Sequence, residues 1–240
     1  MGPVVASVVG QAGGMTTPAP QVLLLDVNET LTDMSRLDAR FGEVLPAGAA
    51  ATPWRALWFA RLLRDGFAMT AAGLEPSFAE LARVQAEQVL ALAGADDPTE
   101  AASHVLAGLP LLDLHPDVPE ALHRLAGAGH RLVPFTNGSP DVAVAAFERG
   151  GVLDLFEFRL SVVDAGAWKP DRRAYEWAAA QVGVATSACT LVAVHPWDLM
   201  GAAAAGCGTA WVRRGASWPG YLDRPQLEAD DLADVADQLT

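Results

Sequence analysis

Short uncharged apolar runs alternate with amphipathic segments along most of this chain. The first run, Val22 to Leu25, shows no alternation of apolar and polar side chains, which predicts a strand buried on both faces of a sheet. Similar runs predict strands at 131–135, 158–163, 190–194 and 209–212. Helical spacing predicts intervening helices at 117–128, 141–149, 171–182 and 199–206. Strands that alternate with helices in this way predict the α/β class, with a parallel sheet and right-handed crossovers.

The pattern between the first two strands is different. Residues 34–109 carry apolar side chains at three- and four-residue spacing, interrupted by proline and glycine, and contain no strand pattern. Helices are predicted at 34–44, 53–72, 76–93 and 97–107. We therefore expect a helical domain, 34–109, inserted into a core formed by residues 21–33 and 110–240. Residues 1–20 carry no charge and lack the pattern of a secretory signal, and we expect them to form a flexible tail.

Polar side chains follow four of the predicted strands. They are Asp26 after the first, Thr136 and Asn137 after the second, Lys169 in the loop after the third, and His195 with Asp198 after the fourth. Because the carboxyl ends of parallel strands meet at one edge of a sheet, these side chains are expected in a single crevice. Thr30 is close enough along the chain to turn back to the oxygens of Asp26. An alternative interpretation of Asp26 alone is a residue that only caps a turn or a helix.

Composition narrows the range of partners. The formal net charge of −13 argues against nucleic acid and anionic membrane surfaces, because both require positive patches. An anionic substrate must then be bound by a few local donors. No apolar run approaches the ~20 residues that a membrane-spanning helix needs. The only cysteines, Cys189 and Cys207, suggest a reducing, cytoplasmic location without disulfide bonds.

Four short motifs resemble those of the haloacid dehalogenase superfamily. They are Asp26-Val-Asn-Glu-Thr30, Phe-Thr136-Asn-Gly-Ser, Lys169-Pro-Asp and His195-Pro-Trp-Asp198-Leu-Met-Gly. Each motif is weak alone, but their order and their positions at strand ends make the set specific. The resemblance covers nearly all of residues 21–215. It implies a Rossmann-like core, and it implies that the helical insert is a cap domain that closes over the site.

The branch of the superfamily follows from two positions. Most members hydrolyse phosphate esters with Mg²⁺, and they carry an acidic general acid where this chain has Asn28 and an acidic metal ligand where it has Val194. A Mg²⁺ site needs oxygen ligands, which an isopropyl group does not supply. The chain is more similar to the metal-free 2-haloacid dehalogenases, which implies no metal and no cofactor. Trp54-Arg55, Tyr175 and Trp197 also have counterparts in that group.

That resemblance implies a reaction on a small 2-substituted carboxylate. Asp26 would displace halide from the α-carbon and form an ester, which water then hydrolyses at the ester carbonyl. Lys169 would keep Asp26 ionised, and Asp198 would orient or deprotonate the water. The substrate carboxylate would be bound by Thr136, Lys169 and the N–H groups of Val27 and Asn28. Arg55, with Trp197 or Asn137, would receive the halide. Tyr175 would be a support, and His195 would be a base, an electrophile or a residue that only holds the loop in place.

The sequence also departs from this group. Asn28 and Glu29 replace the Tyr-Gly pair that is usual in the nucleophile motif, and His195 ends a segment where Ser-Ser-Asn is common. Three alternatives therefore stay open: a Mg²⁺-dependent phosphatase that uses Asp198 as a ligand, a hydrolase that opens a strained-ring 2-carboxylate, and a non-catalytic binding protein. The apolar helices of the insert make a homodimer an additional expectation.

Overall fold

The computed structural model describes residues 21–46, 48–49 and 53–240, so the tail expected at 1–20 lies outside the described residues. The described chain forms one six-stranded sheet, in the order β3-β2-β1-β4-β5-β6, and every pairing is parallel. Its strands are β1 (Val22–Leu25), β2 (Arg131–Thr136), β3 (Leu160–Ser161), β4 (Cys189–Ala193), β5 (Gly208–Val212) and β6 (Leu227–Ala229). The predicted α/β class with a parallel sheet is confirmed.

Strand β1 occupies the centre of the sheet. Leu24 lies opposite Val133 of β2 on one side and opposite Leu191 of β4 on the other. The chain builds the sheet outward from β1 through β2 to β3, and then returns to add β4, β5 and β6 on the opposite side of β1. Open sheets of this kind bind ligands where the strand order reverses. The crevice should therefore lie at the carboxyl ends of β1 and β4.

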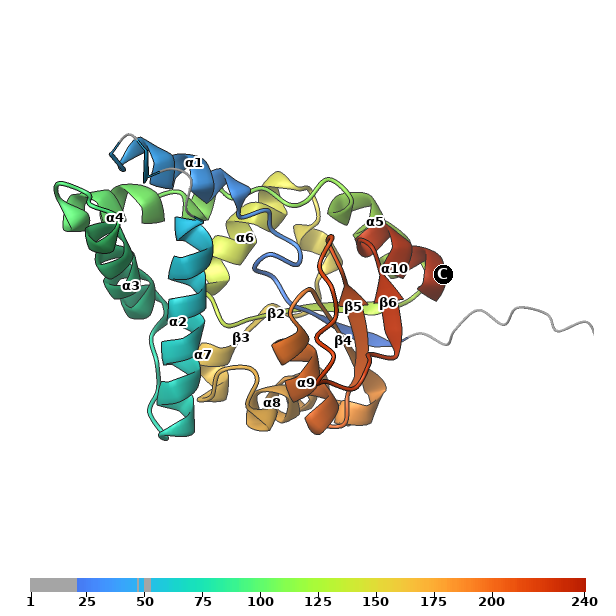
Figure 1. The fold of residues 1–240 in the computed structure, drawn as a ribbon. Coiled ribbons are helices and arrows are strands. Elements are labelled where there is room, and N and C mark those ends of the chain that lie inside the picture. Colours follow the sequence, from blue (N-terminus) through green and yellow to red (C-terminus); the bar gives the residue numbers. More distant parts are fainter. Residues whose placement is uncertain (1–20, 47, 50–52) are drawn as a thin grey trace, which may run out of the picture.

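Helices cover both faces of the sheet (Figure 1). They are α5 (Val118–Gly127), α6 (Pro140–Arg149), α7 (Val162–Ala165), α8 (Arg172–Val182), α9 (Pro196–Ala204) and α10 (Leu232–Leu239), with short 3₁₀ turns η2 (Leu109–Leu111), η3 (Leu153–Leu155) and η4 (Thr186–Ala188). Leu24 packs in the same core cluster as residues of α8 and α9, whereas Leu23 and Leu25 pack with residues of α5 and α10. Strand β1 is thus buried on both faces, as its uniform apolar pattern predicts.

Four of the helices between β1 and β2 in the chain form a group beside the sheet (Figure 1). They are α1 (Ser35–Glu43), α2 (Trp54–Ala71), α3 (Phe78–Leu92) and α4 (Pro98–Leu106). The Ser77 hydroxyl caps α3, and the Asp97 carboxylate caps α4, whose first residue is proline. The fully buried Trp58 of α2 belongs to the same core cluster as Leu24 of β1. The helical group therefore packs against the sheet through a continuous apolar core.

Some predicted boundaries differ from the structure. The strand predicted at 158–163 is only β3, because the Ser161 hydroxyl accepts a hydrogen bond from the Val163 N–H and begins α7. The helix predicted at 199–206 begins at Pro196, directly after the fourth motif's histidine. Strand β6 and helix α10 were not predicted. Within the described residues, every helix is too short or too polar to cross a bilayer.

Candidate active site

Asp26 lies at the carboxyl edge of the sheet, where β1 ends. Its backbone N–H still donates to the Val192 carbonyl of β4 (3.0 Å), so the sheet fixes where its side chain begins. The Thr30 hydroxyl turns back and donates to Asp26 Oδ2 at 2.6 Å, as the sequence spacing suggested. Thr30 Oγ1 in turn accepts the Val194 N–H at 3.0 Å. The loop after β1 is therefore tied to the loop after β4, and the Asp26 carboxylate has a fixed orientation.

Lys169 lies between two carboxylates and has no exposed side-chain surface. Its Nζ donates to Asp26 Oδ1 (2.8 Å), to Asp198 Oδ2 (2.6 Å) and to the Phe135 carbonyl (2.9 Å). Burial alone would raise the pKa of Asp26, but Lys169 and His195 together hold that pKa well below its usual value. Burial likewise opposes the charge on Lys169, yet the two carboxylates raise its pKa. Asp26 is therefore ionised at every physiological pH.

Asn137 holds the backbone of the Lys169 loop. Its side-chain oxygen accepts the Lys169 N–H and its side-chain nitrogen donates to the Lys169 carbonyl, both at 3.0 Å. These two bonds use both ends of the amide. The structure thus places Asn137 in the candidate site as a support for Lys169, beside the carboxyl end of β2.

Asp198 is enclosed on all sides. Oδ2 accepts from Lys169, and the Tyr175 hydroxyl contacts Oδ1 at 2.5 Å and the Asp198 carbonyl at 2.9 Å. Burial, and then the nearby charge of Asp26, raise the pKa of Asp198 against the attraction of Lys169. Burial and the Asp198 carboxylate raise the pKa of Tyr175 well above 10, so its hydroxyl remains a donor. Tyr175 therefore holds Asp198 in place, and Asp198 in turn binds Lys169.

His195 bridges the Asp26 carboxylate and a second carboxylate. Nδ1 lies 3.2 Å from Asp26 Oδ2, and Nε2 lies 3.0 Å from Glu29 Oε2. Burial would lower the pKa of His195, but hydrogen bonds and charge from these two carboxylates raise that pKa to about 9. The imidazole is therefore protonated at neutral pH and donates from both nitrogens. Its ring stacks on Trp197, with 5.0 Å between the ring centroids.

Glu29 extends this chain of contacts to the helical group. The Arg55 guanidinium at the start of α2 donates from Nη1 to Glu29 Oε1 (2.7 Å) and from Nε to Asp38 Oδ1 (3.0 Å). Glu29 has φ +62°, a left-handed backbone conformation that residues other than glycine adopt only at a cost in free energy. The series Arg55, Glu29, His195 and Asp26 thus connects α2 to the carboxylate at the sheet edge. From the sequence, Glu29 was only a departure from the usual motif and was not among the predicted site residues.

The remaining predicted site residues make other contacts. The Thr136 hydroxyl accepts the Gly138 N–H at 2.8 Å, which leaves its own proton free to donate. A methyl group on Gly138 would lie 3.1 Å from Asn28 Nδ2 and 3.2 Å from Thr136 Oγ1, so both polar groups face this glycine. The Val27 side chain is buried in the core, and it can offer a ligand only its backbone. Trp197 packs between His195 and an aromatic residue of α2, Phe67.

The residues present do not fit the Mg²⁺ ion that the phosphatase alternative would require. The two carboxylates that could bind it, Asp26 and Asp198, already enclose the Lys169 ammonium. Val194 contributes no oxygen from its side chain, and Mg²⁺ prefers oxygen ligands. Among the described residues, no cluster of three or more His, Cys, Asp or Glu side chains is arranged to hold a metal.

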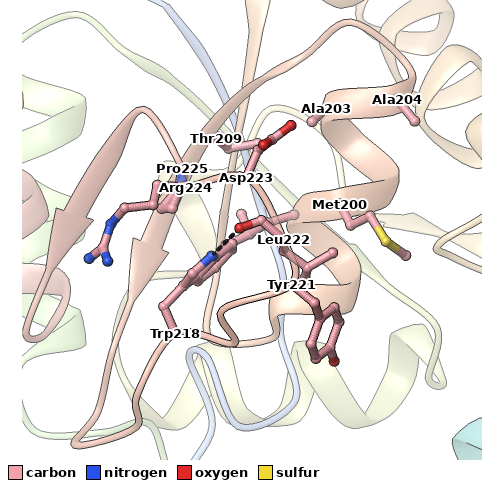
Figure 2. A pocket seen from close by; sticks show the side chains of 11 residues that line it. Met200, Ala203, Ala204, Thr209, Trp218, Tyr221, Leu222, Asp223, Arg224 and Pro225 are labelled. Carbon is pink, nitrogen blue, oxygen red and sulfur yellow. Dashed lines mark hydrogen bonds between the residues drawn. The ribbon is translucent and has the colours of Figure 1, made fainter.

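A cleft of about 440 Å³ lies elsewhere, between α9 and the segment that leads from β5 to β6 (Figure 2). Its walls include Met200, Trp218 and Tyr221. None of the residues predicted for the site lines this cleft. The predicted residues gather instead at the edge of the sheet where the strand order reverses.

Comparisons with known proteins identify the family to which the chain is similar. The model of the haloacid dehalogenase-like hydrolase family matches residues 20–206. The chain is 37% identical over 98 residues to the (S)-2-haloacid dehalogenase of Pseudomonas sp. (strain YL), a match that covers 41% of this chain and only 42% of that relative. It is 26% identical over 202 residues to (S)-2-haloacid dehalogenase 4A of Burkholderia cepacia, covering 84% and 87% of the two chains.

A solved structure has the same fold. The L-2-haloacid dehalogenase of Xanthobacter autotrophicus superposes with a TM-score of 0.80 at 20% identity, over 91% of this chain and 97% of that one. At this identity the likeness concerns the fold alone. The family match, in contrast, covers most of the chain and all four strand-end motifs. The protein belongs to the haloacid dehalogenase-like hydrolase family.

Proposed function

We propose that this protein is a hydrolytic, metal-independent dehalogenase of small 2-haloalkanoic acids. The observation that carries the proposal is the Asp26 carboxylate, which is kept ionised at the sheet edge by Lys169 at 2.8 Å and by Thr30 at 2.6 Å. A carboxylate held in this way is a nucleophile that needs no activating base. The relatives that match the sequence are named (S)-2-haloacid dehalogenases, which supports the same substrate class. We further propose that the helical group α1–α4 is a cap over this site.

In the first step, an Asp26 oxygen attacks the α-carbon from the side opposite the halogen. A carbon–oxygen bond forms, the carbon–halogen bond breaks, and halide leaves with the electron pair. Arg55 and Trp197 are the groups that we propose to receive the halide. The substrate carboxylate is assigned to the Thr136 hydroxyl and the backbone N–H groups of Val27 and Asn28. Lys169 has three N–H donors, and all three already have protein acceptors, so it does not contribute to substrate binding.

In the second step, water must attack the carbonyl carbon of the Asp26 ester, and His195 is the better placed base. Both oxygens of Asp198, the base that the sequence suggested, are engaged by Lys169 and Tyr175. His195 instead lies 3.2 Å from Asp26 Oδ2, and Glu29 holds its other nitrogen. We therefore assign the activation of the water to His195. Glu29 orients the His195 imidazole, and Asp198 holds Lys169 in place.

The protonation state of His195 follows the charge on Asp26. In the resting enzyme two carboxylates keep the imidazole protonated. Ester formation removes the negative charge of Asp26, so the pKa of His195 falls and its proton passes to solvent. The neutral imidazole then accepts a proton from the attacking water. Collapse of the intermediate breaks the bond between the Asp26 carbonyl carbon and the substrate oxygen, and that oxygen takes the second proton of the water. The hydroxy acid leaves, the Asp26 carboxylate and the protonated His195 are restored, and each turnover yields one hydroxy acid, one halide and one proton.

Halide release in the presence of a chelator tests this function. We expect the protein to release halide from 2-bromopropionate and 2-chloropropionate in excess EDTA, and Asp26→Asn to abolish this release. Asp154→Asn, which changes an exposed carboxylate outside the four motifs, is the matched control and should keep full activity. A four-membered-ring 2-carboxylate in the same panel tests the ring-opening alternative. Phosphate release from an aryl phosphate that EDTA abolishes, without halide release from any haloacid, would refute the proposal in favour of a phosphatase.

A further inference from the structure

A second cavity adjoins the candidate site from the side of the helical group. It has a volume of about 330 Å³ and lies between the start of α3 and two core segments, 138–140 and 162–168. Its walls are mainly apolar and include Pro76, Phe78, Pro140, Val162, Val163 and Trp168. A pocket of this size and character is typical of sites that enclose an apolar part of a small molecule.

Gly138 is the point where this cavity meets the candidate site. The glycine lines the cavity. A methyl group at this position would approach Asn28 Nδ2 at 3.1 Å, Thr136 Oγ1 at 3.2 Å and Phe78 Cε2 at 3.8 Å. The Thr136 hydroxyl is assigned to the substrate carboxylate, as is the backbone N–H of Asn28, whose side chain is the nearest of the three contacts. Phe78 belongs to the cavity wall. Because Gly138 has no side chain, the cavity and the carboxylate subsite are separated by very little protein.

The cavity wall is also fixed in place without a ligand. The Trp168 indole N–H donates to the Pro76 carbonyl at 3.1 Å, and the Trp168 and Phe78 rings stack with 6.0 Å between centroids. Trp168 directly precedes Lys169, so the wall is continuous with the residue that pairs with Asp26. A preformed apolar wall of this kind does not have to be ordered when a ligand binds, and less free energy is lost on binding.

We propose that this cavity is the subsite for the apolar tail of the substrate, so that the enzyme accepts 2-haloacids with a long unbranched chain or a phenyl group beyond the α-carbon. This inference rests on the proposed function and adds the substrate class to it. The one acidic residue of the lining, Glu75, makes the subsite unsuited to a tail that ends in a second carboxylate. We therefore expect 2-bromohexanoate and 2-bromo-3-phenylpropionate to be substrates and 2-bromoadipate to be a poor one.

The test fills the cavity from a position outside the catalytic cluster. Ala79 is an exposed residue of α3 that lines the cavity, and Ala79→Phe places a ring inside it. Ala91→Phe, at an exposed site at the other end of the same helix, is the matched control. The measured quantity is kcat/KM for 2-bromohexanoate divided by kcat/KM for 2-bromopropionate. Since loss of room for even one methylene changes kcat/KM by about 10–200-fold, we expect this ratio to fall at least tenfold in Ala79→Phe and to stay unchanged in the control.

A second variant covers the case in which Ala79→Phe does not fold, as judged from circular dichroism and thermal melting. Val163 lines the cavity and its surface is 68% exposed, so Val163→Asp should fold and should lower the same ratio by making the wall anionic. An unchanged ratio in a folded variant overturns the subsite. The subsite is also overturned if the wild type releases halide from 2-bromopropionate but not from either long substrate. If no haloacid releases halide, the proposed function itself has failed.

Discussion

At the scale of single residues, the charge state of His195 depends on its two neighbours. Glu29 and Asp26 both accept hydrogen bonds from the imidazole. Only Asp26 changes charge during the proposed reaction, from a carboxylate to a neutral ester. The same histidine can therefore be a cation that holds the nucleophile in place and, after ester formation, a base that removes a proton from water.

Replacing His195 should separate the two chemical steps. We expect His195→Gln to form the Asp26 ester but to hydrolyse it about 10²–10⁴-fold more slowly, because a positioned base contributes about this factor. Mass spectrometry of the acid-quenched enzyme should then show the substrate's acyl-chain mass retained on the peptide that contains Asp26. Glu29→Gln should give a smaller accumulation, since the histidine keeps its place but loses its charged partner. Ester accumulation in Asp198→Asn together with normal turnover in His195→Gln would instead identify Asp198 as the base.

Lys169 should be as important for stability as for activity. Its replacement leaves Asp26 and Asp198 as buried carboxylates without a cation, and losing one partner of a buried ion pair costs about 3–5 kcal/mol. We expect Lys169→Met to lower the free energy of unfolding in urea by this amount and to abolish activity. Adding Asp198→Asn to Lys169→Met should restore part of the lost stability, because one uncompensated charge is removed. Two independent, additive losses would contradict this account of the pair.

At the scale of elements, the sequence predicted those parts whose pattern is strong and local. The predicted helices of the 34–109 insert match α1 to α4 within two residues at each end, since their apolar spacing and capping residues are local signals. Strand β3 was predicted too long, because its end is set by the Ser161 cap. Strand β6 has only three residues, too few for a periodic pattern to be recognised. The strand order and the domain boundaries required information that the pattern does not contain, and the boundaries remain a prediction.

The same distinction between local and non-local signals applies to the candidate site. Asp26, Lys169 and Asp198 were predicted to lie together because strand ends meet at one edge, and the structure brings them into direct contact. The role of Glu29 was not predicted. It depends on a left-handed backbone conformation and on partners 26 and 166 positions away along the chain, neither of which leaves a local signal.

Helix α2 should influence the site through its contact with Trp168. A Cβ at Gly66 of α2 would overlap the Trp168 ring. Gly66→Ala should therefore lower the free energy of unfolding by about 1–3 kcal/mol through overpacking, and should reduce kcat because Trp168 precedes Lys169. Gly42→Ala in α1 is the matched control, since a Cβ there has nothing within 4 Å. The control should stabilise the protein by about 0.5–1 kcal/mol, the usual gain for alanine over glycine in a helix. Urea denaturation of both variants measures the difference, and a neutral Gly66→Ala would show that α2 can shift freely.

At the scale of the whole molecule, the fold places a few cations inside a strongly acidic protein. The net charge of −13 repels an anionic substrate at long range, so binding depends on donors within the site. Those donors are arranged around one carboxylate, Asp26, which Lys169 and His195 approach from different sides. Folding must desolvate all three groups together, and the pH dependence of the overall stability should reveal this coupling.

The free energy of unfolding should fall as the pH rises through the pKa of His195. In the folded protein that pKa is raised to about 9, by Asp26 and Glu29 against the effect of burial, whereas the unfolded value is about 6.5. A group whose pKa is raised on folding stabilises the protein fully below the unfolded pKa, and the stabilisation is lost as the pH passes the folded pKa.

The difference between the folded and unfolded pKa of His195 corresponds to a contribution on the order of 3 kcal/mol below pH ~6.5 that disappears above pH ~9. Other groups also change charge on the alkaline side in the folded or the unfolded protein, so the wild type must be compared with His195→Gln at each pH. We expect urea denaturation to give a stability difference between the two proteins that is largest near pH 6 and shrinks steadily toward pH 9.5. A difference that stays constant across this range would mean that the imidazole is not held as a cation between the two carboxylates, and the proposed switch of His195 from cation to base would lose its starting state.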